Sequence, residues 1–409
     1  MIDKIKPETI NNLLTEDASL RKANAKVYPL GSNKYHAAIH LGDIHYKDNY
    51  SDNLEQWKDI DLTWSGNRID KAPYILVRDG NVFTVTDKRT GLQSLIELSA
   101  IGTTAITKAA ATAAKTENLA PNVDFEVIPQ NHQIRFQRTL KNALAAKDAK
   151  FKITGDLPIK YQAYDADGEP VELTTEIKDG ILTETVKDKS GLKYPIKVDP
   201  TINLDVAASA DDCDVYWNGS AWVISLTRAL IRVGYNLAAS SNCGSAMRFQ
   251  NANIPSGVSI DTAYITFTAS NSDSNNNVMS QIWGEKATSP AEFSTIADYQ
   301  ARCGVLVGGA DNSKRTTAVV SYDAIAAWTK DTTYNSPELK TVVQEISDLG
   351  AVSHIALFWL DHAGVSTATD YTIRRAYSYD GDPAKAPVLH IEYTYFRSRL
   401  AYYFQNIMR

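Results

Sequence analysis

Short alternating segments joined by two-residue turns constrain the fold of this chain more than any other feature. Asp79-Gly80 lies between the apolar-rich residues 74–77 and 82–85, and Asp179-Gly180 separates two segments of the same kind. An Asp-Gly pair favours the tight turn of an antiparallel hairpin, because the backbone of that turn needs positive φ angles. We therefore predict a mainly β fold that begins with an antiparallel β-rich domain.

Length and charge limit the classes of function. A chain of 409 residues is long enough for two or three domains, each with its own core. The net charge is −6, whereas a nucleic-acid-binding face must be basic to neutralise phosphates. No apolar run approaches the roughly 20 residues that span a bilayer. We therefore expect neither nucleic acid nor a membrane as a partner.

The N-terminal residues 1–30 are expected to form a helical arm. Residues 7–22 carry a helical pattern, which ends at a turn-like Tyr-Pro-Leu-Gly segment over residues 28–31. The residues on one face of this helix are Thr9, Ile10, Leu13 and Leu14. The first eight residues lack the apolar stretch of a secretory signal, so we expect the chain to be made in the host cytoplasm without a signal peptide, as virion proteins are.

The β-rich N-terminal domain is predicted over residues 31–201. Residues 100–120, rich in Ala and Thr, are either a helix or a surface loop. Pro195 and Pro200 lie in an extended segment at residues 194–201, which suits a strand that leaves one domain and enters the next. This segment sets the predicted boundary near residue 201.

Residues 202–394 are predicted to form an antiparallel sandwich with two short capping helices. One helix is expected to begin at Ser289-Pro290, with Glu292 completing a capping box. The other is expected to begin at Ser336-Pro337. Its apolar stripe comprises Leu339, Val342, Val343, Ile346 and Leu349, and Gly350 ends it. The last strand covers residues 386–394, and a separate tail follows at residues 395–409.

Several segments of this second half, taken in order, resemble one module family. They are residues 211–217, 247–249, 254–260, 263–267, 334–340 and 386–394, preceded by the Tyr-Pro-x-x-x-Asp-Pro-Thr stretch at residues 194–201. Together they are similar to the DNRLRE-type jelly-roll modules of secreted wall proteins and of phage virion structural proteins. The resemblance covers residues 202–394 and implies a jelly-roll β-sandwich that binds or assembles and does not catalyse.

No sequence motif for catalysis is found. The chain contains neither Gly-x-Ser-x-Gly nor Gly-x-x-x-x-Gly-Lys-Ser/Thr. On a strand, His36 and His40 share a face but lie about 13 Å apart, and His45 follows a turn. This separation is too large for two ligands of one metal ion, so we expect ordinary strand histidines. Asp59 and Asp61 are similarly expected on a solvent-facing strand surface.

Three carboxylates and two tryptophans are the candidate ligand-binding residues of the second half. Asp211, Asp212 and Asp214 are candidate ligands of a structural calcium ion, because hard cations favour carboxylate oxygens. No other cofactor is expected. Trp217 and Trp222 flank the turn Asn218-Gly219 and are candidates for stacking on a sugar, although core positions are the alternative.

The C-terminal tail combines aromatic and basic residues beyond the last predicted strand. Its apolar members are Phe396, Leu400, Tyr403, Phe404 and Ile407. Such a segment is unfavourable in water, so it packs either on its own chain or on a partner subunit. The second alternative makes these residues candidate assembly contacts.

The cysteines indicate neither a zinc site nor a disulfide framework. Cys213, Cys243 and Cys303 are few and widely spaced, and buried free thiols are the expected state. A bridge between Cys213 and Cys243 remains the alternative.

Three functions are compatible with these patterns. The first is a phage virion structural protein, such as a capsid decoration, fibre, tail or baseplate component, located in the virion and contacting copies of itself or other virion proteins. The second is a carbohydrate-binding or adhesive cell-surface module. The third is a polysaccharide-degrading enzyme that uses Asp59 and Asp61. We favour the first, and we expect the chain not to be an enzyme.

Overall fold

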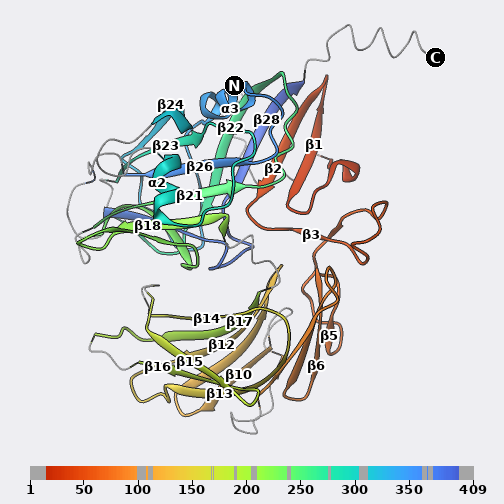
Figure 1. Cartoon of the computed structure of the whole chain (residues 1–409), viewed down its shortest axis with the longest axis vertical. Helices are drawn as coiled ribbons and strands as arrows, with labels where there is room; N and C mark the ends of the chain where they lie inside the picture. Colours follow the sequence, from red (N-terminus) through yellow and green to blue (C-terminus); the bar gives the residue numbers. More distant parts are fainter. Residues whose placement is uncertain are drawn as a thin grey trace. The chain divides into compact units, whose positions relative to one another are not determined.

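The computed structural model of the chain describes residues 15–98, 107–108, 114–166, 168, 170–187, 191–203, 210–236, 241–274, 278–303, 312–361, 366 and 372–395. It is mainly β and its strand pairs are antiparallel, as predicted. The chain divides into two compact units, both drawn in Figure 1. Unit 1 comprises Met1–Leu41 and Ala207–Arg409, and unit 2 comprises Gly42–Val206.

Unit 2 contains two large sheets and a two-stranded one. The six-stranded sheet runs β14 (Ile159–Tyr164), β17 (Ile196–Asn203), β12 (Gln133–Leu140), β11 (Val123–Pro129), β10 (Ala114–Ala120), β9 (Thr107–Lys108). The seven-stranded sheet runs β15 (Leu173–Lys178), β16 (Ile181–Val186), β13 (Asp148–Gly155), β8 (Gln93–Glu97), β7 (Val82–Asp87), β6 (Tyr74–Asp79), β5 (Arg68–Ile69). The small sheet pairs β3 (His45–Tyr46) with β4 (Lys58–Asp59).

Aromatic residues from the two large sheets meet in the core of unit 2. Phe83 of the seven-stranded sheet and Phe136 of the six-stranded sheet have ring centroids 5.6 Å apart. Phe125 and Phe151 make a second contact between the sheets at 6.5 Å. The rings are buried because alternate residues of each strand face inward, so unit 2 is a β-sandwich.

Both predicted Asp-Gly hairpins of unit 2 are confirmed. β6 pairs with β7 up to Asp79 opposite Val82, and β15 pairs with β16 up to Lys178 opposite Ile181. At the second turn Asp179 and Gly180 have φ angles of 51° and 74°. Two consecutive positive φ angles match the mirror-image turn that the right-handed twist of a hairpin favours.

Unit 1 also has two facing sheets. The five-stranded sheet runs β1 (Ala25–Gly31), β2 (Lys34–His40), β28 (Val388–Tyr395), β22 (Val258–Thr268), β25 (Thr333–Asn335). The eight-stranded sheet runs β19 (Trp222–Ser225), β18 (Asp212–Trp217), β21 (Ser241–Phe249), β26 (Ile355–Leu360), β23 (Met279–Glu285), β24 (Arg315–Asp323), with β20 (Leu230–Asn236) pairing β21 and β27 (Thr372–Tyr377).

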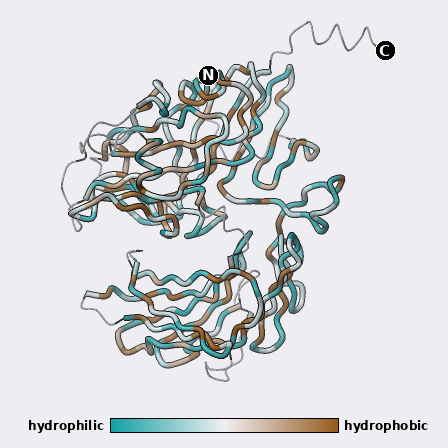
Figure 2. The backbone as a smooth tube through the Cα atoms, viewed as in Figure 1, coloured by the Kyte–Doolittle hydropathy of each residue, from teal (hydrophilic) through white to brown (hydrophobic). Residues whose placement is uncertain are grey.

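The core of unit 1 joins these two sheets. Phe267 of β22 stacks on Trp359 of β26, with ring centroids 4.6 Å apart. Trp359 and Trp283 are buried, as the sequence predicts for their apolar strands. Apolar and polar segments interleave along the backbone of each unit in Figure 2, which is the pattern of strands with one buried face.

The first predicted domain boundary is wrong. β1 and β2, which fall within the predicted arm and β-rich domain, belong to the five-stranded sheet of unit 1, where β2 pairs with β28 from Lys34 opposite Thr394 to His40 opposite Val388. Ala37 and Ile39 thereby enter the core. Pairing with a strand at the other end of the chain leaves no local signal in the sequence, and the β1–β2 hairpin lacks an Asp-Gly turn.

The second boundary and the arm also differ from prediction. Residue 201 lies inside β17, so the units change over at residues 206–207 instead. Of the predicted helix over residues 7–22, the described part is not α-helical, and Ala18–Leu20 form a single 3-10 turn capped by Asp17. Its predicted face, Thr9, Ile10, Leu13 and Leu14, lies outside the described residues. Of residues 100–120, the two described parts are the strands β9 and β10, and neither is a helix or a loop.

Both helices begin later than predicted. α2 spans Ile296–Cys303, because Pro290 and Phe293 make backbone contacts with Arg248 and Ala210 that hold the segment outside a helix. α3 spans Lys340–Ser347. The apolar stripe of α3 is confirmed by the burial of Leu339, Val342, Val343 and Ile346, whereas Leu349 is exposed. Within the described residues, no helix combines the length and the apolar character needed to cross a membrane.

Candidate functional site

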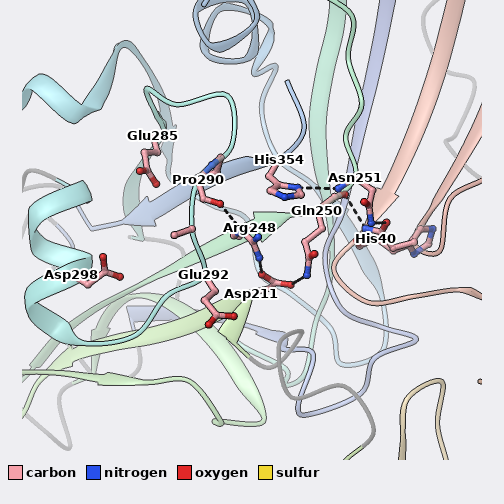
Figure 3. Close-up of polar contacts among 12 residues, drawn as sticks. His40, Asp211, Arg248, Gln250, Asn251, Glu285, Pro290, Glu292, Asp298 and His354 are labelled. Atoms are coloured by element: carbon pink, nitrogen blue, oxygen red, sulfur yellow. Dashed lines mark hydrogen bonds and ion pairs between the residues drawn. The ribbon is translucent and has the colours of Figure 1, made fainter. Parts of the chain in front are cut away.

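A polar cluster at one end of β21 links charged and amide side chains of unit 1 (Figure 3). Arg248 pairs with the carboxylate of Asp211, and its Nε donates to the carbonyl oxygen of Pro290 at 2.8 Å. Gln250 donates from Nε2 to the other Asp211 oxygen. Asp211 is buried, so these donors replace the water that a charged carboxylate would otherwise need. We call this group, with the residues added below, the Arg248 network.

The network extends to the N-terminal hairpin. The backbone N–H of Asn251 donates to Nδ1 of His354 at 3.2 Å, and its side chain donates to Oδ1 of Asn24 at 2.8 Å. Asn24 in turn donates to the carbonyl oxygens of His40 and Gln250 at 2.8 and 3.0 Å. The hairpin is therefore anchored to the end of β21 by side-chain amides as well as by the strand ladder.

The protonation state of His354 follows from this geometry. Nδ1 accepts a hydrogen bond from a backbone N–H, which requires the unprotonated nitrogen. Burial lowers the pKa of His354, and the nearby positive charge of Arg248 lowers it further. The ring is consequently neutral near pH 7, and the Arg248 network holds a compensated charge pair and a neutral acceptor. This arrangement suits a structural anchor.

A second arginine fixes α2 against the sheet. Arg302 of α2 donates from Nε to Glu285 of β23 at 2.8 Å and from Nη1 to Asp298 at 3.2 Å. It also donates to the backbone carbonyls of Ala291 and Glu292 at 2.9 and 3.2 Å. One guanidinium thus satisfies two carboxylates and two carbonyls of the loop before the helix, which uses most of its donors.

The carboxylates predicted as calcium ligands are engaged within the chain. Besides Asp211, Asp212 accepts from the backbone N–H of Tyr379 at 2.7 Å. Asp214 lies 2.9 Å from both Arg228 and Arg232. Among the residues that the structure describes, no group of three or more His, Cys, Asp or Glu is placed to hold a metal ion. The arginine partners are distant in sequence, so the local pattern that suggested calcium did not reveal them.

The two candidate glycan-contact tryptophans form a pair. Trp217 and Trp222 are cross-strand partners in the β18–β19 hairpin, with ring centroids 6.1 Å apart at 68°. Both are half-buried beside the exposed turn residues Asn218 and Gly219. Trp222 packs against the adjoining core cluster, so the pair is part core and part surface. Sugar binding at this pair stays a prediction.

Asp59 and Asp61 do not form an isolated carboxylate pair. Asp59 lies opposite His45 across the β3–β4 ladder, with 3.5 Å between Oδ1 and Nε2. Asp61 accepts hydrogen bonds from Thr63 and lies 3.3 Å from Lys71. The hydrogen bonds from Thr63, followed by Lys71, lower the pKa of Asp61. A glycosidase acid needs a raised pKa, so the environment of Asp61 opposes that role.

The fold creates a histidine contact that the sequence patterns did not predict. His36 and His40 share a face of β2 as expected, and β28 brings His390 to His36, with 3.4 Å between Nδ1 of His390 and Nε2 of His36. Tyr264 stacks on His390 at 4.7 Å. Burial lowers the pKa of His390 to about 3, and His36 and His40 contribute to that shift. Only the register of β2 with β28, which local sequence patterns do not specify, would have revealed this cluster.

The cysteines and the C-terminal tail are the remaining residues that the sequence singled out. Cys213, Cys243 and Cys303 are buried thiols, and Cys213 and Cys243 are not bridged to each other. Burial raises the pKa of the Cys243 thiol to about 12, which keeps it protonated and unreactive. The tail residues Phe396, Leu400, Tyr403, Phe404 and Ile407 lie outside the described residues.

A buried ion pair lies between the two sheets of unit 2. Arg138 of β12 and Glu184 of β16 are both buried, with 3.5 Å between Nη2 and Oε2. Burial raises the pKa of Glu184 to about 7, and Arg138 opposes the shift. The pair separates the core around Phe136 from a smaller core around Leu140. Its position inside the sandwich favours a role in strand register.

Comparison with known proteins gives no family. No family model matches this chain, and no curated protein matches it. Among solved structures, a chain of the T13 IBDV viral particle is 11% identical, with 94% of this chain and 74% of that chain covered and a TM-score of 0.16. The GH31 alpha-xylosidase from Xanthomonas citri is 9% identical, with 94% and 38% covered and a TM-score of 0.08. At these TM-scores neither similarity identifies a fold or a function.

Proposed function

We propose that this chain is a structural protein of a phage virion that acts through protein–protein contacts, as a capsid decoration, fibre, tail or baseplate component. The observation that carries the proposal is the closure of the chain in one sheet. β2, near the start, and β28, near the end, are hydrogen-bonded neighbours. Unit 2 is inserted between them in the sequence.

This closure has a mechanical consequence. β2 lies between β1 and β28, and β28 lies between β2 and β22, so each strand is paired on both sides. Ile39 and Leu389 bury their side chains in the same core. Opening of the unit from either strand therefore requires loss of core contacts and of two ladders together, which opposes local fraying. Resistance to fraying suits a protein that must hold its shape in a particle.

The buried charges support the same proposal. Asp211, Asp214 and Glu285 each pair with an arginine of the same chain and so stabilise the scaffold. The resemblance of residues 202–394 to DNRLRE-type modules adds the expectation of binding or assembly. The partners we propose are copies of the chain and other virion proteins.

Particles assembled without this protein provide the test. We expect the purified full-length chain, added to such particles, to bind with saturation at a fixed number of copies per particle. Asp211→Ala weakens the scaffold, so this variant shows whether binding depends on the native fold. Failure of the folded wild-type chain to sediment with the particles at any concentration would contradict the proposal.

A glycan-binding function is the second candidate, and the Trp217–Trp222 pair favours it. Half-buried aromatic rings beside an exposed turn offer a flat surface to a sugar. Trp217→Ala should then abolish retention on a host-surface polysaccharide column while the variant remains folded. Equal retention of the wild type and of both Trp217→Ala and Trp222→Ala would exclude this pair as the site.

A further inference from the structure

β15 is an open edge of unit 2. It is the terminal strand of the seven-stranded sheet, and β16 is its only strand partner among the described residues. Residues 174–178 are all exposed, and Ile177 has 58% of its surface exposed. An edge strand presents unpaired backbone groups that another strand can use. An exposed isoleucine on such a strand adds apolar surface that pairing would bury.

The hydrogen bonds to β16 identify the groups that face the open side. The N–H of Lys187 donates to the carbonyl oxygen of Glu172 at 3.0 Å, in the same register as the β15–β16 ladder. Antiparallel ladders alternate, so Thr174, Glu176 and Lys178 also direct their backbone groups to β16. The backbone groups of Thr175 and Ile177 are directed away from β16.

The start of the strand is partly occupied. The N–H of Val171 donates to the carbonyl oxygen of Ala163 at 2.8 Å, and Tyr164 forms a bridge with Pro170. These contacts hold the end of β14 beside the segment that enters β15. A new strand therefore has access to Thr175 and Ile177, and less to Leu173.

Few antiparallel registers are available for self-pairing at this edge. Outward-directed residues must face each other, so a two-fold axis passes through Thr175, Glu176 or Ile177. An axis at Thr175 needs Leu173, where β14 is close. An axis at Glu176 places two glutamates opposite each other, which is destabilising.

The remaining register is complementary. With the axis at Ile177, Glu176 of one copy faces Lys178 of the other, and the two-fold symmetry repeats this pair. The two Ile177 side chains then face each other at the axis. We infer that β15 pairs antiparallel with β15 of a second copy of this chain, with Ile177 on the two-fold axis, joining two seven-stranded sheets edge to edge.

This inference rests on the proposed assembly function and names one surface that serves it. The overlap is short, so the contact is weak in isolation and acts together with other contacts in an assembly. Isologous pairing also closes the edge, because each β15 then has a strand on both sides. Charged side chains on an edge strand usually oppose pairing with another chain. Here Glu176 and Lys178 oppose registers that bring like charges together and favour the register with its axis at Ile177.

A single cysteine at the axis tests the geometry in the full-length chain. Facing hydrogen-bonded residues have Cα atoms about 5.5 Å apart, within the range of a disulfide. Ile177→Cys should therefore yield a disulfide-linked dimer under mild oxidation. Thr175→Cys is the matched control, because its copies would lie about 13 Å apart in this register and should remain monomeric. The three native cysteines are buried, so the wild type should show no linkage.

Charge reversal tests the complementarity. Lys178→Glu in the Ile177→Cys background should reduce the linked fraction by roughly tenfold, because it places carboxylates opposite each other. Adding Glu176→Lys restores opposite charges and should restore the linkage. Unchanged unfolding temperatures will verify that these exposed substitutions leave unit 2 folded.

The outcomes separate this inference from the proposed function. The β15 contact would be overturned if Thr175→Cys were linked more strongly than Ile177→Cys. It would also be overturned if adding Glu176→Lys to Lys178→Glu failed to restore the linkage. In that case saturable particle binding would still support the assembly function. Absence of both linkage and particle binding would overturn the two together.

Discussion

His36 of β2 and His390 of β28 lie with their ring nitrogens 3.4 Å apart, although 354 positions separate them in the chain. The contact exists because the β2–β28 ladder places the two strands side by side. On the far side of His36, Nδ1 lies 3.6 Å from Oε1 of Glu392. This contact lowers the pKa of Glu392, and its carboxylate stays charged beside the histidine pair.

The first prediction concerns acid sensitivity at His390. The pKa of this ring is about 3 in the folded state, against the usual 6.5 of a histidine, so the unfolded chain binds an extra proton between these limits. Stability is unaffected by this group above pH 6.5 and falls as the pH is lowered, by up to about 1.4 kcal/mol per pH unit. His390→Gln should flatten that part of the stability profile, measured by denaturant unfolding.

The control for this prediction is His40→Gln. This substitution leaves the buried His390 ring in place, so the slope below pH 6.5 should persist. An equal slope in the wild type and in His390→Gln would show that another group causes the acid sensitivity.

The second prediction concerns the Arg248 network. Asp211→Ala leaves the guanidinium of Arg248 buried without its carboxylate, and removal of one partner of a buried pair costs about 3–5 kcal/mol. The free energy of unfolding should fall by that amount. Faster amide exchange in β1 and β2 should accompany it, since the network anchors this hairpin through Asn24.

A surface ion pair provides the comparison. Asp61→Ala removes a partner of Lys71 at a site where both side chains are largely in solvent, so the loss of stability should be much smaller than that caused by Asp211→Ala. Equal effects of Asp211→Ala and Asp61→Ala would contradict the structural role assigned to Arg248.

The third prediction has the opposite pH dependence. Burial raises the pKa of Glu184 from the usual 4.5 to about 7, so the folded chain binds the extra proton between these values. Stability from this group is highest at low pH and declines as the pH rises from 4.5 to 7. Glu184→Gln, which cannot ionise, should remove this decline between pH 4.5 and 7.

Thermal unfolding followed from pH 4 to pH 8 checks this third prediction. Unit 2 must be followed separately from unit 1, and amide exchange in β12 and β16 gives that resolution. An equal decline in the wild type and in Glu184→Gln would show that a group other than Glu184 causes it.

The fourth prediction concerns the N-terminal hairpin. Deletion of residues 1–41 removes Ala37 and Ile39 from the core of unit 1 and leaves β28 at an open edge. We expect the truncated chain to aggregate and to lose cooperative unfolding of unit 1. Deletion of residues 1–14 alone, which keeps β1 and β2, should leave that transition in place. A soluble truncated chain with a normal transition would show that the hairpin is dispensable.

Local signals account for the parts of the fold that the sequence predicted. The Asp179-Gly180 turn and the apolar stripe of Val342, Val343 and Ile346 depend on residues close together in the chain. The membership of β1 and β2 in unit 1 depends on the distant strand β28. No pattern within residues 25–40 specifies that partner, so the predicted domain boundary failed there.

The candidate site was harder to predict for the same reason. Asp211, Asp212 and Asp214 were recognised as a carboxylate group, but their partners come from other strands and loops. A carboxylate is satisfied equally by a cation or by a guanidinium, and only the fold determines which donor is nearby. The contact of His36 with His390 was missed because it depends on strand register.

The most direct test of the central claim is the mass of the full-length chain in solution as a function of concentration, measured by sedimentation equilibrium. An assembly protein should form a reversible, closed oligomer whose population rises with concentration. A single monomeric species at every concentration, together with turnover of a polysaccharide, would contradict the account.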